Sequence, residues 1–178
     1  GLTNEIKVAT ARSGSAQFAA GTAFSGTGTG GEVLQISADG TSTITHTGFG
    51  TGLMRGSLYV DRTGVFNGDL IVATTAGEVW RMDGSGTKTM IASTGVHLEG
   101  LITVPNDPGT YGPLAGKIIA GAEGTGDMYV IDSSGTFTTE TLTWSNGAVI
   151  RIEDIDLISG NENFFGMAAL ISTCLLYT

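Results

Sequence analysis

Short segments of alternating or continuous apolar residues, separated by glycine-rich turns, make up most of this chain. Hydrophobic and polar residues alternate in EVWRMD (Glu78–Asp83), DMYVID (Asp127–Asp132) and TKTMIAS (Thr87–Ser93). A period of two places successive side chains on opposite faces of a β-strand. No long segment has the 3.6-residue period of a helix. The pattern therefore predicts an all-β fold.

One phrase of eleven residues occurs three times, as GEVLQISADGT from Gly31, GEVWRMDGSGT from Gly77 and GDMYVIDSSGT from Gly126. A second glycine follows nine residues after the first in each copy, and the copies begin 46 and then 49 residues apart. Self-similarity at such a period indicates a repeat architecture. The second half of each phrase has the glycine and polar residues of a hairpin turn.

Each repeat also contains two more apolar segments. The first segment is SLYVD, LITVP and IDLIS in three successive repeats. The second segment is DLIVATT, KIIAGA and NFFGMAAL in the same repeats. Each repeat therefore contains four strands: two apolar strands, the strand formed by the repeated phrase, and a threonine-rich outer strand. Four antiparallel strands of this length are the blade of a β-propeller. We expect a propeller fragment of about three and a half blades, at residues 1–47, 54–94, 98–143 and, incomplete, 152–178.

The fourth repeat has no glycine phrase of its own and ends in LISTCLLYT, which contains the single cysteine, Cys174. The codons TGT-CTC-TTA-TAC-ACA encode CLLYT, and this nucleotide string occurs in a transposon adapter used for sequencing libraries. One interpretation is a truncated metagenomic reading frame that ran into adapter sequence; the alternative is a natural apolar strand. Because propellers close with about four to eight blades, we expect open blade edges to cause self-association as a homodimer.

The composition limits the classes of partner that the protein is expected to bind. The net charge of -9 and the pI of about 4.4 give a surface that repels phosphate backbones, so no nucleic-acid partner is expected. No apolar run approaches the length of about 18 residues that a membrane span needs, so no membrane insertion is expected. The acidic surface, rich in Thr, Gly and Ser, is typical of a secreted bacterial protein, which predicts an extracellular or periplasmic location.

Two longer phrases, HLEGLITVPNDP (His97–Pro108) and EDIDLISGNENFFG (Glu153–Gly166), carry a resemblance. With them the chain resembles uncharacterised secreted bacterial β-propeller proteins. More distantly, its blade pattern is similar to that of NHL-repeat and gluconolactonase-like propellers. This second resemblance implies a ring of carboxylates at the channel mouth that can hold a divalent metal.

Blade topology places the turn before each inner strand and the loop between the second and third strands on the same face. We expect that face to collect the candidate site residues, namely Arg55, His97, Glu99, Glu123, Glu153 and Asp154. Carboxylates on flexible loops suit Ca²⁺, which takes several oxygen ligands. The expected metal ligands are Glu99, Glu153 and Asp154, and the expected ligand-binding residues are Arg55, His97, Glu99, Glu123 and Asp154. The alternative is a set of solvated loop charges, or an arginine–glutamate pair between blades.

Three functional hypotheses follow. The first is an extracellular, non-enzymatic propeller module that binds a small molecule, a glycan or a protein, with Ca²⁺ supporting the site. The second is a metal-dependent lactonase or ester hydrolase of the gluconolactonase type, in which His97 or Glu123 is the general base. The third is a truncated fragment without activity.

Overall fold

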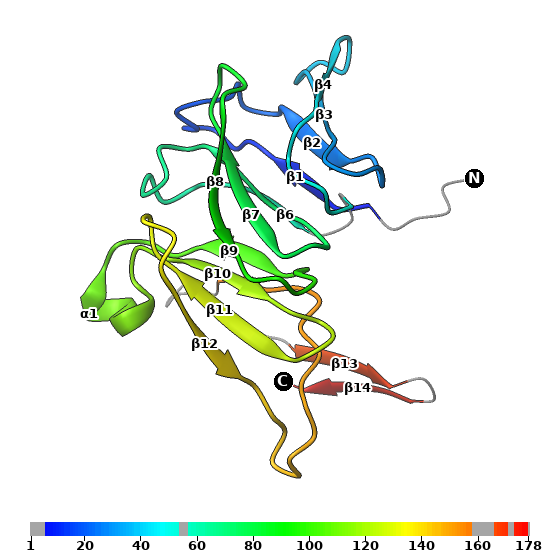
Figure 1. The fold of residues 1–178 in the computed structure, drawn as a ribbon, viewed down its shortest axis with the longest axis vertical. Helices are drawn as coiled ribbons and strands as arrows, with labels where there is room; N and C mark the ends of the chain where they lie inside the picture. The colour runs from blue at the N-terminus through cyan, green and yellow to red at the C-terminus, as the bar shows by residue number, and fades with distance from the viewer. Residues whose placement is uncertain (1–5, 54–56, 158–165, 171–172, 178) are drawn as a thin grey trace.

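The structure, a computed structural model, describes residues 6–53, 57–157, 166–170 and 173–177. Over these ranges the chain forms three four-stranded antiparallel sheets and one two-stranded hairpin (Figure 1). No helix in the described part of the chain is long and apolar enough to cross a membrane. The predicted all-β fold with four-stranded antiparallel blades is confirmed.

Within each sheet, every strand pairs with the next strand along the chain. The first sheet contains β1 (Val8–Thr10), β2 (Ala23–Gly26), β3 (Val33–Ile36) and β4 (Thr43–His46). The second contains β5 (Ser57–Val60), β6 (Leu70–Ala73), β7 (Glu78–Met82) and β8 (Lys88–Ser93). The third contains β9 (Leu101–Thr103), β10 (Ile118–Gly121), β11 (Asp127–Ile131) and β12 (Phe137–Thr141). The hairpin contains β13 (Gly166–Leu170) and β14 (Thr173–Tyr177).

The three sheets lie side by side as consecutive propeller blades. Their first strands are neighbours, since β5 contacts both β1 and β9. In the predicted fourth blade, β13 and β14 pair as a second and third strand would. The described residues 155–157 of its expected inner strand are not in a strand. The origin of the terminal CLLYT residues stays a prediction.

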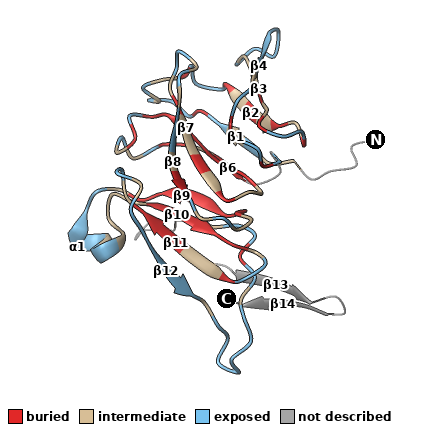
Figure 2. Ribbon diagram, in the orientation of Figure 1, coloured by how far each residue is buried: buried red, intermediate tan, exposed pale blue. Residues whose placement is uncertain are grey.

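Apolar side chains fill both spaces between the blades. Figure 2 shows buried residues along the strands β6, β9 and β10. All four residues of β6 are buried, because this strand lies between two neighbouring sheets. Leu70 and Val72 pack toward the first sheet, whereas Ile71 and Ala73 pack toward the third. Burial on both faces explains why this segment is continuously apolar, whereas the outer strand β12 is mostly polar and exposed throughout.

The glycine that opens each repeated phrase lies against the segment that leads to the next blade. The three glycines, Gly31, Gly77 and Gly126, have φ angles of 64°, 80° and 71°. This left-handed region favours glycine. A Cβ on Gly77 would lie 2.5 Å from the carbonyl oxygen of Val96, and one on Gly126 would lie 2.5 Å from that of Ile150. Glycine is therefore required twice over, by its backbone angle and by the close approach of the linking segment.

The second half of each phrase forms a turn closed by a carboxylate. Asp83 Oδ1 accepts hydrogen bonds from the backbone N–H groups of Ser85 and Thr87, at 2.9 and 3.0 Å, and from the Ser85 hydroxyl at 2.6 Å. Asp132 makes the equivalent three bonds in the third blade. This network supplies the turn's backbone donors with partners and fixes the hairpin.

The segment between β9 and β10 contains two short helical turns, α1 (Pro108–Tyr111) and η1 (Gly112–Leu114). Asp107 caps α1 by accepting hydrogen bonds from the backbone N–H groups of Gly109 and Thr110. An aspartate followed by proline is a recognisable start of a helix. These turns lie at the opposite end of the third blade from the candidate site described below.

The close approach at Gly77, the glycine that opens the second repeated phrase, gives a prediction about stability. Gly77→Ala should lower the free energy of unfolding by about 1–3 kcal/mol more than Gly95→Ala, because the added methyl group must displace packed atoms. Gly95 is a matched control: it has a φ of 74°, but a Cβ there meets nothing within 4 Å. Urea denaturation of both variants measures the difference. Equal losses would show that the close approach contributes nothing beyond the backbone angle.

The turn carboxylates give a pH prediction. Hydrogen bonds led by that of the Ser37 hydroxyl lower the pKa of Asp39 from 3.8 to about 2. Because the folded value lies below the ordinary one, the turn's contribution to stability is complete above the ordinary pKa and is lost as the pH falls through the folded value. Carbon-detected NMR titration should give this low pKa, and Thr41→Val, which removes a donor, should raise it. An unshifted Asp39 in the wild-type protein would contradict the prediction.

A candidate metal-binding site at the channel mouth

The candidate site forms where loops of the third blade meet at one end of its inner strands. The segment between β8 and β9 carries His97 and Glu99, and Glu123 follows the end of β10. The Glu99 N–H donates to the carbonyl oxygen of Gly121, and the Gly121 N–H donates to that of Gly100, both at 2.9 Å. These bonds continue the β9–β10 pairing beyond the strands. They hold the two loops together.

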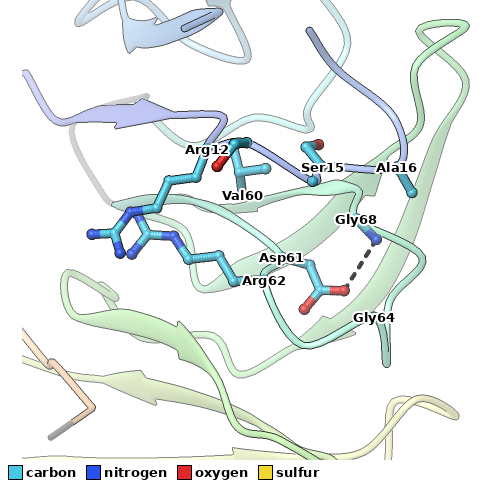
Figure 3. A pocket seen from close by; sticks show the side chains of 10 residues that line it. Arg12, Ser15, Ala16, Val60, Asp61, Arg62, Gly64 and Gly68 are labelled. Carbon is cyan, nitrogen blue, oxygen red and sulfur yellow. Dashed lines mark hydrogen bonds between the residues drawn. The ribbon is translucent and has the colours of Figure 1, made fainter. Parts of the chain in front are cut away.

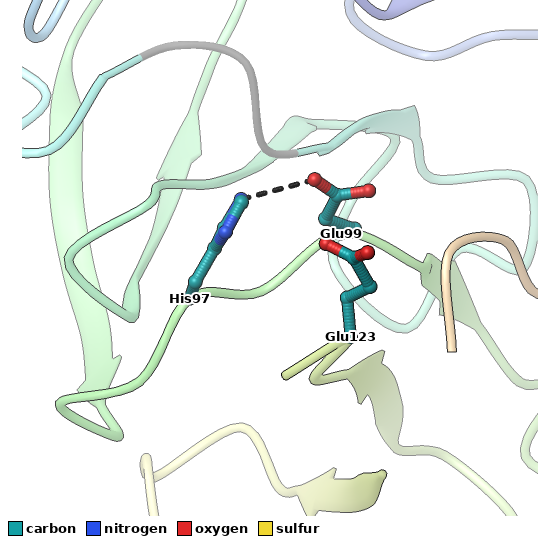
Figure 4. Close-up of side chains that lie close together, drawn as sticks. All are labelled: His97, Glu99 and Glu123. Carbon is teal, nitrogen blue, oxygen red and sulfur yellow. Dashed lines mark ion pairs between the residues drawn. The ribbon is translucent and has the colours of Figure 1, made fainter. Parts of the chain in front are cut away.

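His97, Glu99 and Glu123 form one group, here called the mouth cluster (Figure 4). Each offers one ligand atom, and all three atoms lie within 4.8 Å of one another. His97 Nε2 lies 3.1 Å from Glu99 Oε1, without the alignment of a hydrogen bond. The two atoms approach as an ion pair when the imidazole is protonated. Figure 4 shows the three side chains converging, with His97 and Glu99 on one segment and Glu123 on another.

Burial makes the charge of the mouth cluster unusual. The Glu99 side chain is only 2% exposed, whereas His97 and Glu123 are about 30% exposed. A buried carboxylate needs a compensating positive charge or strong hydrogen bonds. Lys7 Nζ lies 3.8 Å from Glu99 Oε2, and Arg151 Nη1 lies 3.8 Å from Glu123 Oε1. Both distances are long for an ion pair. Each carboxylate also lies near the other members of the mouth cluster.

The geometry of the mouth cluster fits a small divalent cation. Metal–ligand distances of about 2.0–2.2 Å in a tetrahedral zinc site place neighbouring ligand atoms about 3.4 Å apart. The separation of 3.1 Å between His97 Nε2 and Glu99 Oε1 is close to that value. Small rotations of Glu123 would bring its oxygen to the same distance. Three protein ligands would leave a coordination position open toward solvent, as in catalytic and ligand-binding metal sites.

The structure brings together three of the residues that the sequence predicts for the site, His97, Glu99 and Glu123. Glu153 and Asp154 are exposed and are not part of this cluster. The described residues 155–157 of this segment are not in a strand. The segment places Ile152, not a carboxylate, in the buried position against Gly121. Arg55 lies outside the described residues.

Sequence reasoning missed two residues of the site, Lys7 and Arg151. Lys7 directly precedes β1 of the first blade, so its approach to Glu99 depends on how distant blades pack. Arg151 lies next to Ile152 in the segment that follows the third blade. Neither position carries a local pattern that distinguishes it from a solvated charge.

Comparisons with known proteins identify the fold and no closer relationship. No protein-family model and no curated protein matches the chain. The structure is similar to virginiamycin B lyase from Staphylococcus aureus, with a TM-score of 0.56 and 14% identity, covering 73% of this chain and 41% of the lyase. It is also similar to a streptogramin B lyase, with a TM-score of 0.54 and 10% identity over 73% of this chain and 40% of that one.

A third similar structure is YCF48 bound to D1 peptide, with a TM-score of 0.53 and 13% identity, covering 75% of this chain and 38% of that chain. At these identities the likeness concerns the fold alone. The present chain spans about two fifths of the length of these three structures.

Proposed function

We propose that this chain is a β-propeller binding module whose mouth cluster holds a divalent metal ion and presents it to an oxygen-bearing ligand. The observation that supports this most strongly is the convergence of His97, Glu99 and Glu123, with ligand atoms within 4.8 Å of one another. Glu99 is buried, so a bound cation would be shielded from water on that side. Solvent reaches the other side, where His97 and Glu123 are partly exposed.

The donor set favours Zn²⁺ over the Ca²⁺ expected from the sequence. Ca²⁺ takes six to eight oxygen ligands, whereas the mouth cluster offers one imidazole nitrogen and two carboxylates. Imidazole is a good ligand for zinc and related transition metals. We therefore propose a zinc-type site with Glu123 as its most mobile ligand. Lys7 and Arg151 would neutralise the carboxylates when the metal is absent.

The structural neighbours include both binding proteins and enzymes and do not define a ligand. One of the similar propellers is a peptide complex and two are lyases. Propellers with this blade arrangement thus serve both binding and catalysis, and fold alone does not decide between them. We propose binding as the function, and an extracellular or periplasmic location from the acidic composition.

Calorimetric titration of the metal-free protein with Zn²⁺ and Ca²⁺ tests this proposal. We expect one zinc ion per chain, bound more tightly than calcium. His97→Ala, Glu99→Gln and Glu123→Gln should each weaken zinc binding by at least about tenfold, since even outer-shell partners of metal ligands contribute 10–100-fold. Glu153→Gln is the matched control, because it removes a nearby exposed carboxylate of the same type and should bind zinc normally.

Two results would contradict the site as proposed. One is the absence of saturable zinc binding by the wild-type protein. The other is a loss of binding in Glu153→Gln equal to that in Glu99→Gln. A panel of lactones assayed with the metal-loaded protein separates the hydrolase alternative: turnover abolished by Glu99→Gln would favour catalysis over binding.

We also propose that two copies of the chain associate through the open face of the first blade. On this face β-pairing aligns Val8, Ser25, Leu34 and Thr45. Val8 is 62% exposed, whereas Phe24 on the opposite face is fully buried against the second blade. An inner blade strand normally has a neighbouring blade on each side, so the exposed apolar face resembles an unoccupied blade interface.

Light scattering coupled to size-exclusion chromatography tests self-association. We expect the wild-type protein to elute as a dimer and Val8→Glu as a monomer, because the carboxylate would be buried in the interface. Ile44→Glu is the control: Ile44 is 54% exposed and shares the other face of the same sheet with Phe24. It should remain dimeric. A monomeric wild-type protein, or a dimeric Val8→Glu, would rule out this interface.

A further inference from the structure

A second site lies at the other ends of the inner strands. The segment from Lys7, beside the mouth cluster, to Arg12 contains β1. β5 runs alongside it and ends before Asp61 and Arg62. Five residues of extended chain span about 16 Å, so Arg12 and Arg62 lie on the face opposite Glu99. We propose that this face carries a binding site for a small oxyanion, a carboxylate or a phosphate, held by Arg12 and Arg62.

A cavity of about 270 Å³ is present at this position (Figure 3). Its walls are residues 12–16 from the first blade, Val60–Arg62 from the second, and two glycines of the β5–β6 hairpin, Gly64 and Gly68. Arg12 and Arg62 also line a second cavity of about 330 Å³ between the inner strands. Figure 3 shows the Arg12 and Arg62 side chains extending toward the same side of the view from the segments that follow β1 and β5. The two guanidinium groups therefore share one solvent-accessible space.

These two arginines differ from most other cations of the described chain. The cations of four other residues, Lys7, Arg81, Lys117 and Arg151, each lie within 4 Å of a carboxylate oxygen. Neither Arg12 nor Arg62 forms such an ion pair with a described residue. Two like charges that line the same cavities repel each other, and an acidic protein of net charge -9 has many carboxylates, none of which pairs with either arginine among the described residues. An external anion is a physically favourable partner.

Asp61 lines the same cavity, but its carboxylate is not the counter-ion of the two arginines. Its carboxylate accepts hydrogen bonds from five donors, namely the Thr63 N–H and hydroxyl, the N–H groups of Phe66 and Gly68, and the Thr103 hydroxyl. These donors occupy its lone pairs and tie the second blade to the third. Burial alone would raise the pKa of Asp61, but the hydrogen bonds, led by the Thr63 hydroxyl, keep it below the ordinary value. The other facing carboxylates, Asp154 and Asp156, line only the adjoining cavity.

The remaining walls suit an oxyanion attached to a small organic group. The Arg62 guanidinium lies 5.1 Å from the centre of the Tyr59 ring, a contact that leaves its in-plane N–H donors available. Ser13 and Ser15 line the cavity and add neutral hydroxyl donors. Ala16 and Val60 supply an apolar surface. Paired guanidinium groups match the planar oxygens of a carboxylate or the oxygens of a phosphate.

NMR titration of the isotope-labelled protein with glucuronate, with inorganic phosphate and with uncharged glucose tests the site. We expect saturable shifts at residues 12–16 and 60–64 with at least one of the two anions, and none with glucose. The two anions distinguish a carboxylate site from a phosphate site. Arg12→Gln and Arg62→Gln should each weaken binding by about tenfold or more, as expected for the loss of a charge-assisted hydrogen bond.

Lys88→Gln is the matched control. Lys88 lies on the outer strand β8 and, like the two arginines, has no ion pair with a described carboxylate. The Lys88→Gln substitution removes the same charge from a distant position, so anion binding should be unchanged. Both arginines are exposed, and circular dichroism should show folded variants. The proposal is overturned if neither anion binds saturably, if glucose binds as well as glucuronate, or if the arginine variants bind like Lys88→Gln.

Discussion

The close approach of each linking segment to a glycine is the constraint on which this structure depends. In three successive repeats the chain leaves the outer strand, passes against the glycine that opens the third strand, and enters the next blade. A side chain at Gly77 or Gly126 would collide with the backbone of that segment. The approach sets the position of one blade on the next, and the apolar spaces between blades are filled accordingly.

This packing also determines where the candidate sites lie. Consecutive inner strands run in the same direction, so the loops before them gather at one end of the blades and the loops after them gather at the other. The first end contains the mouth cluster, with its buried Glu99. The second end contains Arg12 and Arg62 around an open cavity. A chain with few charged residues thereby places an acidic group and a basic group on opposite faces of the same blades.

Much of this could be predicted from the sequence, because strand alternation, turn chemistry and repeat spacing are local signals. They were sufficient for the blades and for placing His97, Glu99 and Glu123 on one face. Glu153, which the sequence predicts as a metal ligand, is exposed and lies outside the mouth cluster, and the described residues 155–157 that follow it are not in a strand. The contacts of Lys7 and Arg12 could not be predicted, because they depend on packing between blades and have no local pattern.

The central claim is that His97, Glu99 and Glu123 together form a metal site, and anomalous diffraction from crystals grown with Zn²⁺ tests it most directly. The account predicts one strong anomalous peak within about 2.0–2.2 Å of His97 Nε2 and of an oxygen from each glutamate. A peak beside Glu153 and Asp154, or an ordered mouth cluster without a peak at saturating zinc, would contradict it.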